Sequence, residues 1–166
     1  MKTLDHPSRI QIQAAQGWLE LGNPVEAEAE LEQMTPELRE HPDVLKLRWE
    51  ICAARKKWEE ALEIASALVH LEPDEPLGWV HKSFALHELK RTTEARNNLV
   101  GVVEKFGDSP TIRYNMACYE CQLGRLEQAK LWLEKAFKMG NPVRMKQAAL
   151  KDPDLEPLWV EIRKYF

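Results

Sequence analysis

The chain has 166 residues, of which 44% are hydrophobic and 30% are charged, and its formal net charge is −4. This length and apolar content suffice for the core of one ordinary domain and argue against intrinsic disorder. The acidic balance disfavours a nucleic-acid-binding surface, and no run of about 18 apolar residues predicts a transmembrane helix. We therefore expect neither nucleic acid nor membrane as a partner.

The expected compartment is the cytoplasm. The segment from Met1 to Pro7 has no apolar stretch of the kind that a signal peptide requires. The chain contains three cysteines, and an odd number without an export signal points to reduced thiols.

In chain order, the hydrophobic pattern predicts four pairs of helices. They cover about 8–21 and 24–34, 42–55 and 58–71, 76–89 and 92–106, and 110–123 and 126–139. The first helices of the later pairs begin at prolines spaced 34 residues apart, where a missing N–H costs nothing: Pro42, Pro76 and Pro110. Glycine closes the first helix at Gly22 and Gly124, whereas the two middle pairs carry a lysine there.

Four alanines in the second helices share the same spacing of 34 residues: Ala27, Ala61, Ala95 and Ala129. A fixed period of this size is typical of a solenoid, in which each unit buries its apolar face against its neighbours. Two antiparallel helices approach most closely near the short turn that joins them, and a methyl group permits this approach. We therefore expect all four alanines to pack between paired helices.

The last part of the chain does not complete a fifth unit. Asn141 and Pro142 predict a helix to about Leu150, and the sequence from Asp152 to Asp154 predicts a final helix through Ile162. Because the exposed end of a solenoid needs a covering helix with a polar outer face, we assign residues 142–166 to C-terminal capping helices.

These units resemble the tetratricopeptide repeat (TPR). The resemblance is carried by residues 58–61 and 71–74 of the second unit, and by 114–118, 123–129 and 133–136 of the fourth. It covers about residues 8–141 of one TPR domain, as repeats over 8–41, 42–75, 76–109 and 110–141. The segment 149–159 is similar to the closing segment of some bacterial members.

The resemblance implies an all-α, right-handed superhelical solenoid of antiparallel helix pairs. It also implies a concave groove, lined by the first helices, that binds a peptide or protein partner. The residues that this register places in the groove are Lys46, Glu50, Val80, His81, Phe84, His87, Tyr114, Asn115 and Cys118. Phe84 and Tyr114 are the expected anchors, because aromatic side chains commonly carry much of the binding energy of an interface.

The leading hypothesis is thus a non-catalytic adaptor without cofactor or metal. No nucleophile paired with a base is visible in the sequence, and there is no glycine-rich phosphate loop. One alternative is self-assembly into a homo-oligomeric scaffold, by stacking of exposed terminal units. A weaker alternative is a metal or redox module through the C-x-x-C of Cys118 and Cys121, which lacks the second ligand pair that a zinc site normally has.

Overall fold

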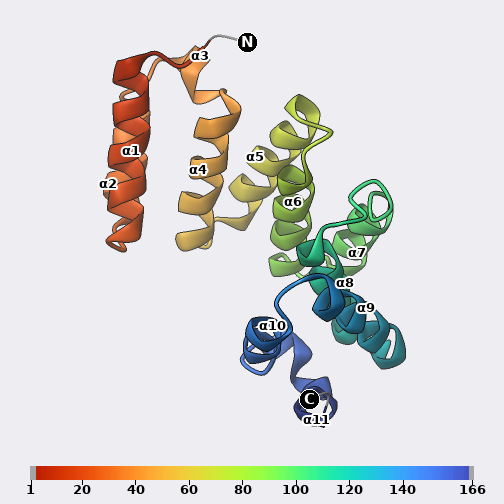
Figure 1. Cartoon of the computed structure of the whole chain (residues 1–166). Helices are drawn as coiled ribbons and strands as arrows, with labels where there is room; N and C mark the ends of the chain where they lie inside the picture. The colour runs from red at the N-terminus through yellow and green to blue at the C-terminus, as the bar shows by residue number, and fades with distance from the viewer. Residues whose placement is uncertain (1–2, 165–166) are drawn as a thin grey trace. The chain divides into compact units, whose positions relative to one another are not determined.

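The computed structural model describes residues 3–164, and in this range the only regular secondary structure is helical (Figure 1). The first helices of the four pairs are α1 (His6–Glu20), α4 (Pro42–Ala54), α6 (Pro76–Glu88) and α8 (Pro110–Gln122). The second helices are α2 (Pro24–Glu32), α5 (Trp58–Leu71), α7 (Thr92–Val100) and α9 (Leu126–Met139). A single turn of helix, α3 (Pro36–Arg39), precedes α4, and the chain closes with α10 (Pro142–Ala149), the 3₁₀ helix η1 (Pro153–Leu158) and α11 (Trp159–Lys164).

The turn inside each helix pair has the same backbone geometry in all four pairs. One residue per turn has a positive φ of 57° to 76°, and these residues are Gly22, Lys56, Lys90 and Gly124. The next N–H bonds the carbonyl five residues earlier, from Asn23, Lys57, Arg91 and Arg125 to Trp18, Cys52, Leu86 and Glu120. This bond is the hallmark of a Schellman turn, so two lysines adopt a conformation that glycine favours.

Substituting Lys56 by glycine is expected to stabilise the chain by about 0.5–1 kcal/mol. A left-handed conformation costs a residue with a Cβ about 1–2 kcal/mol, and part of this gain is offset by the larger entropy of glycine in the unfolded chain. Urea denaturation followed by circular dichroism measures the difference. The reciprocal variant, Gly124→Lys, should lose stability at the equivalent turn, and equal stabilities of both variants and the parent would contradict the explanation.

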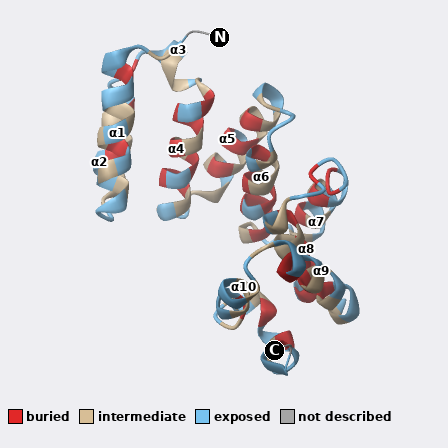
Figure 2. Cartoon of the chain, in the orientation of Figure 1, coloured by how far each residue is buried: buried red, intermediate tan, exposed pale blue. Residues whose placement is uncertain are grey.

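The four repeating alanines are fully buried, with 0% exposure each. Ala27 packs in a cluster with Ala15, Leu31 and Val44, and Ala61 packs in a second cluster with Leu45 and other apolar residues of α4 and α5. Figure 2 shows buried residues along α4 and α5. All four alanines are thus buried, and their position at the close approach of paired helices stays a prediction.

Two predicted elements differ from the structure. The helix expected to reach residue 106 ends at Val100, because Gly101 and the β-branched Val102 and Val103 favour a helix poorly. Turns follow over residues 101–108, and Val102, Val103 and Phe106 are buried there. The final predicted helix begins as the 3₁₀ helix η1 and becomes α-helical only at Trp159. The Trp159 indole N–H donates to the Ala149 carbonyl at 2.9 Å, which ties α11 to the end of α10.

The chain forms two compact units, Met1–Ala85 and Leu86–Phe166, hereafter the N-terminal and C-terminal units. The boundary falls within α6, so one helix contributes side chains to both. Across residues 3–164, every helix is too short or too polar to cross a lipid bilayer.

Candidate functional site

An aromatic cluster joins α4 to α6 in the N-terminal unit. The rings of Trp49 and His81 are stacked, with centroids 3.7 Å apart and planes at 27°. Phe84 lies edge-on to Trp49 at 6.1 Å and tilted against Trp58 of α5 at 5.7 Å. Phe84 nevertheless keeps 38% of its surface exposed. Phe84 therefore packs against both tryptophans and still presents part of its ring to solvent.

His81 belongs to the interior of this unit. Its side chain is 9% exposed, and its Nε2 has no hydrogen-bond partner among residues 3–164. Burial lowers the pKa of His81 to about 4, because a charged imidazolium would lose its hydration. The ring is thus neutral near pH 7. We assign His81 to the core, whereas the repeat register predicts it in the groove.

Three other predicted groove residues of the N-terminal unit are accessible. The Lys46 ammonium on α4 lies 2.9 Å from the Glu72 carboxylate and 3.5 Å from Asp43. Glu50, one helical turn after Lys46, is exposed, and partial desolvation raises its pKa. Val80 on α6 is half-buried. Together with Phe84, we call Lys46, Glu50 and Val80 the α4–α6 face.

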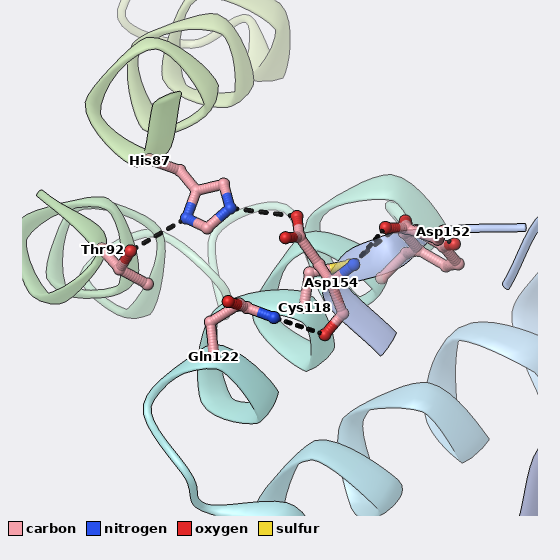
Figure 3. A network of polar contacts seen from close by, with 7 residues as sticks. His87, Thr92, Cys118, Gln122, Asp152 and Asp154 are labelled. Atoms are coloured by element: carbon pink, nitrogen blue, oxygen red, sulfur yellow. Dashed lines mark hydrogen bonds and ion pairs between the residues drawn. The ribbon is translucent and has the colours of Figure 1, made fainter. Parts of the chain in front are cut away.

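Three of the four predicted groove residues of the C-terminal unit meet a segment of their own chain, and these are His87, Tyr114 and Cys118. Figure 3 shows two of them, His87 and Cys118. His87, at the end of α6, is 7% exposed, and its Nε2 lies 3.0 Å from Asp154 Oδ2. Its other ring nitrogen, Nδ1, lies 2.9 Å from the Thr92 hydroxyl at the start of α7. Gln122 of α8 donates from Nε2 to the Asp154 carbonyl at 2.9 Å. The start of η1 is therefore held by side chains of α6 and α8, and Thr92 of α7 supports the His87 ring.

Asp152, which caps η1, is the second centre of these contacts. The Tyr114 hydroxyl donates to Asp152 Oδ2 at 2.9 Å, and the Cys118 thiol donates to the same oxygen at 3.6 Å. The backbone N–H of Asp154 donates to Asp152 Oδ1 at 3.0 Å. His87, Tyr114 and Cys118 thus share one side of the unit, as their spacing predicts, but the segment 152–154 contacts them. Asn115 on α8 remains partly exposed.

The cysteines are all free and buried. Burial raises the pKa of Cys118 well above its usual value and that of Cys121 to about 11, with the nearby Asp152 and Asp154 carboxylates adding to both shifts. Reactive redox cysteines need a lowered pKa, because the thiolate is the nucleophile. These surroundings therefore oppose the redox version of the C-x-x-C alternative.

No family model and no curated protein matches the chain. Among solved structures, MamA MSR-1 aligns with 82% of this chain and 80% of its own, at 15% identity and a TM-score of 0.66. MamA AMB-1 aligns with 79% of this chain and 77% of its own, at 16% identity and a TM-score of 0.64. A MamA mutant gives a TM-score of 0.63. MamA is a TPR-like protein, and the present chain therefore has an all-α, TPR-like solenoid fold of antiparallel helix pairs.

Proposed function

We propose that the protein is a non-catalytic interaction module that binds a peptide or protein partner at the α4–α6 face. The observation that carries this proposal is Phe84, an aromatic ring on a first helix that is 38% exposed. The TPR-like fold supports a general role in protein interaction or scaffolding. A reducing compartment such as the cytoplasm suits its three free thiols.

The α4–α6 face has the chemistry of an interface anchor. The Phe84 ring packs against Trp49 and Trp58, so little side-chain entropy is lost when a partner covers it. On α4, Glu50 is exposed, and the half-buried Lys46 ammonium is paired with Glu72 and Asp43. We expect the partner to place an apolar side chain on Phe84 and to match these charges.

A charge reversal on this face, Glu50→Lys, is expected to weaken partner binding by about tenfold or more while helicity is unchanged. Glu50 is exposed, so the substitution leaves the core intact, whereas a reversed charge at an interface repels the complementary group of the partner. The measurement is affinity capture with the full chain as bait, followed by quantitative mass spectrometry and titration of each recovered protein.

The matched control is Glu63→Lys, which makes the same charge change at an exposed position of α5. A partner of the α4–α6 face binds the parent and Glu63→Lys equally and binds Glu50→Lys weakly. Equal recovery with all three baits would show that the interaction surface lies elsewhere.

Self-assembly is the second candidate, and the N-terminal helix pair favours it. Large apolar side chains are uncovered on α1, α2 and their turn, with 52% exposure for Ile10, 38% for Trp18, 78% for Leu21 and 57% for Val25. Contiguous exposed apolar surface often marks a protein interface. In the capture experiment, recovery of a differently tagged copy of the same chain would support this candidate.

A further inference from the structure

Three metal-ligating side chains converge in the C-terminal unit. One donor atom each from Cys118, Asp152 and Asp154 lies within 4.8 Å of the other two. Cys118 is 5% exposed on α8, and the two carboxylates come from the cap and first turn of η1. His87 Nε2 lies 3.0 Å from Asp154 Oδ2 and so holds this carboxylate from outside the group (Figure 3). The fold thus gathers a thiol and two carboxylates from segments far apart in the sequence.

The distance between two of these donor atoms suits tetrahedral coordination of a metal ion. With Zn–S near 2.3 Å and Zn–O near 2.0–2.2 Å, two ligands of a tetrahedral zinc are about 3.5 Å apart. The Cys118 sulfur and Asp152 Oδ2 are separated by 3.6 Å. We propose that Cys118, Asp152 and Asp154 bind one divalent transition-metal ion, for which Zn²⁺ is the best match, with the fourth position open to water as in other zinc sites with three protein ligands.

The surrounding hydrogen bonds hold both carboxylates in place. Ligating carboxylates are usually hydrogen-bonded to neighbouring groups. Asp152 accepts from the Tyr114 hydroxyl and from the Asp154 N–H. Asp154 Oδ2 lies 3.0 Å from His87 Nε2, and His87 Nδ1 in turn lies 2.9 Å from the Thr92 hydroxyl. These contacts fix the orientation of both carboxylates before an ion arrives.

Charge in this group favours a cation. The carboxylates of Asp152 and Asp154 flank the Cys118 thiol, and within residues 3–164 the only ion pair that either makes is the one between Asp154 and His87. A metal ion would take the position of the thiol proton, which leaves for solvent as the sulfur–metal bond forms. Coordination deprotonates a thiol outright, so the negative surroundings that disfavour a free thiolate would stabilise the complex.

This site differs from the C-x-x-C hypothesis, because Cys121 is not among its ligands. The ion would link α8 to the segment that enters η1, and so anchor the C-terminal cap to its unit. It is independent of the α4–α6 face, so failure of one proposal leaves the other standing.

Cobalt titration of the reduced, tag-free full chain tests the proposal. We expect one Co²⁺ per chain, an intense near-ultraviolet band from sulfur-to-cobalt charge transfer, visible bands of tetrahedral coordination, and loss of all of these when Zn²⁺ is added. Cys118→Ser should abolish the charge-transfer band and weaken Co²⁺ binding at least about 100-fold. Asp154→Asn should keep the band and weaken binding at least about tenfold, which is the lower bound even for residues that only hydrogen-bond to metal ligands.

Cys121→Ser is the matched control, since it removes a buried thiol from the same helix and should leave the spectrum and affinity unchanged. Circular dichroism confirms that each variant is folded. If Cys118→Ser is unfolded, the Co²⁺ affinity of Asp154→Asn decides the outcome instead. The proposal is overturned if the parent shows no charge-transfer band at millimolar Co²⁺. It is equally overturned if the band survives in folded Cys118→Ser or disappears in folded Cys121→Ser.

Discussion

Replacing Arg96 by alanine is expected to lower the free energy of unfolding by about 3 kcal/mol, the cost of leaving a buried charge without its partner. The partner is Glu120, a carboxylate on α8 with 1% exposure. Arg96 on α7 donates from Nε to Glu120 Oε1 at 2.9 Å, and Arg125 reaches the other carboxylate oxygen at 3.3 Å. Because Arg125 is largely exposed, it would compensate only part of the lost interaction.

Chemical denaturation of the full chain, followed by circular dichroism, measures this loss. The matched control is Arg91→Ala, since Arg91 flanks the same helix and pairs with Glu94 at 2.7 Å on the open surface. Solvent-exposed pairs contribute little, so this variant should unfold at nearly the same urea concentration as the parent. Similar losses for both arginines would mean that burial of Glu120 does not set the cost. A Glu120→Gln, Arg96→Ala double variant should recover part of the stability, because no buried charge then remains.

The helices could be predicted from the sequence because a repeat period constrains each unit in the same way. Lys56 and Lys90 show how strong this constraint is, since both take the left-handed conformation of the glycines at equivalent positions. Where the repeat period constrains the sequence less, the helix propensity of the local residues decides where a helix ends. Gly101, Val102 and Val103 end α7 early, although the apolar residues beyond it still enter the core.

The candidate sites were harder to predict, because a helical period shows which side chains share a face and not what covers that face. His87, Tyr114 and Cys118 do share a face, but their contacts with Asp152 and Asp154 join residues that are more than 30 positions apart. Glu120 resembles any solvated glutamate in the sequence, and only the packing of α7 on α8 reveals that it is buried beside Arg96. His81 follows the groove register, yet stacking on Trp49 places it in the interior.

The second large expected effect is a loss of stability at acid pH that is caused by His81. We expect the chain to lose up to about 3 kcal/mol of stability between pH 6.5 and pH 4 through this one group, because one pKa unit corresponds to about 1.36 kcal/mol. Burial lowers the pKa of His81 to about 4, whereas an unfolded histidine titrates near its ordinary value of 6.5. Within this window the unfolded chain binds a proton that the folded chain excludes. Stability therefore falls as pH decreases through the unfolded pKa, and the loss is complete below the folded pKa.

Two variants isolate this contribution. His81→Phe keeps an aromatic ring against Trp49 and removes a buried Nε2 that has no partner among the described residues, so it should match or exceed the parent in stability at pH 7. His81→Gln removes the titrating group without an aromatic ring. Urea denaturation at intervals from pH 8 to pH 4 should show a shallower acid slope for both variants than for the parent. An unchanged slope in both would assign the acid sensitivity to carboxylates elsewhere. If His81→Gln kept the fall in stability at acid pH and His81→Phe lost it, the cause would be the polar packing of the site and not protonation of the imidazole.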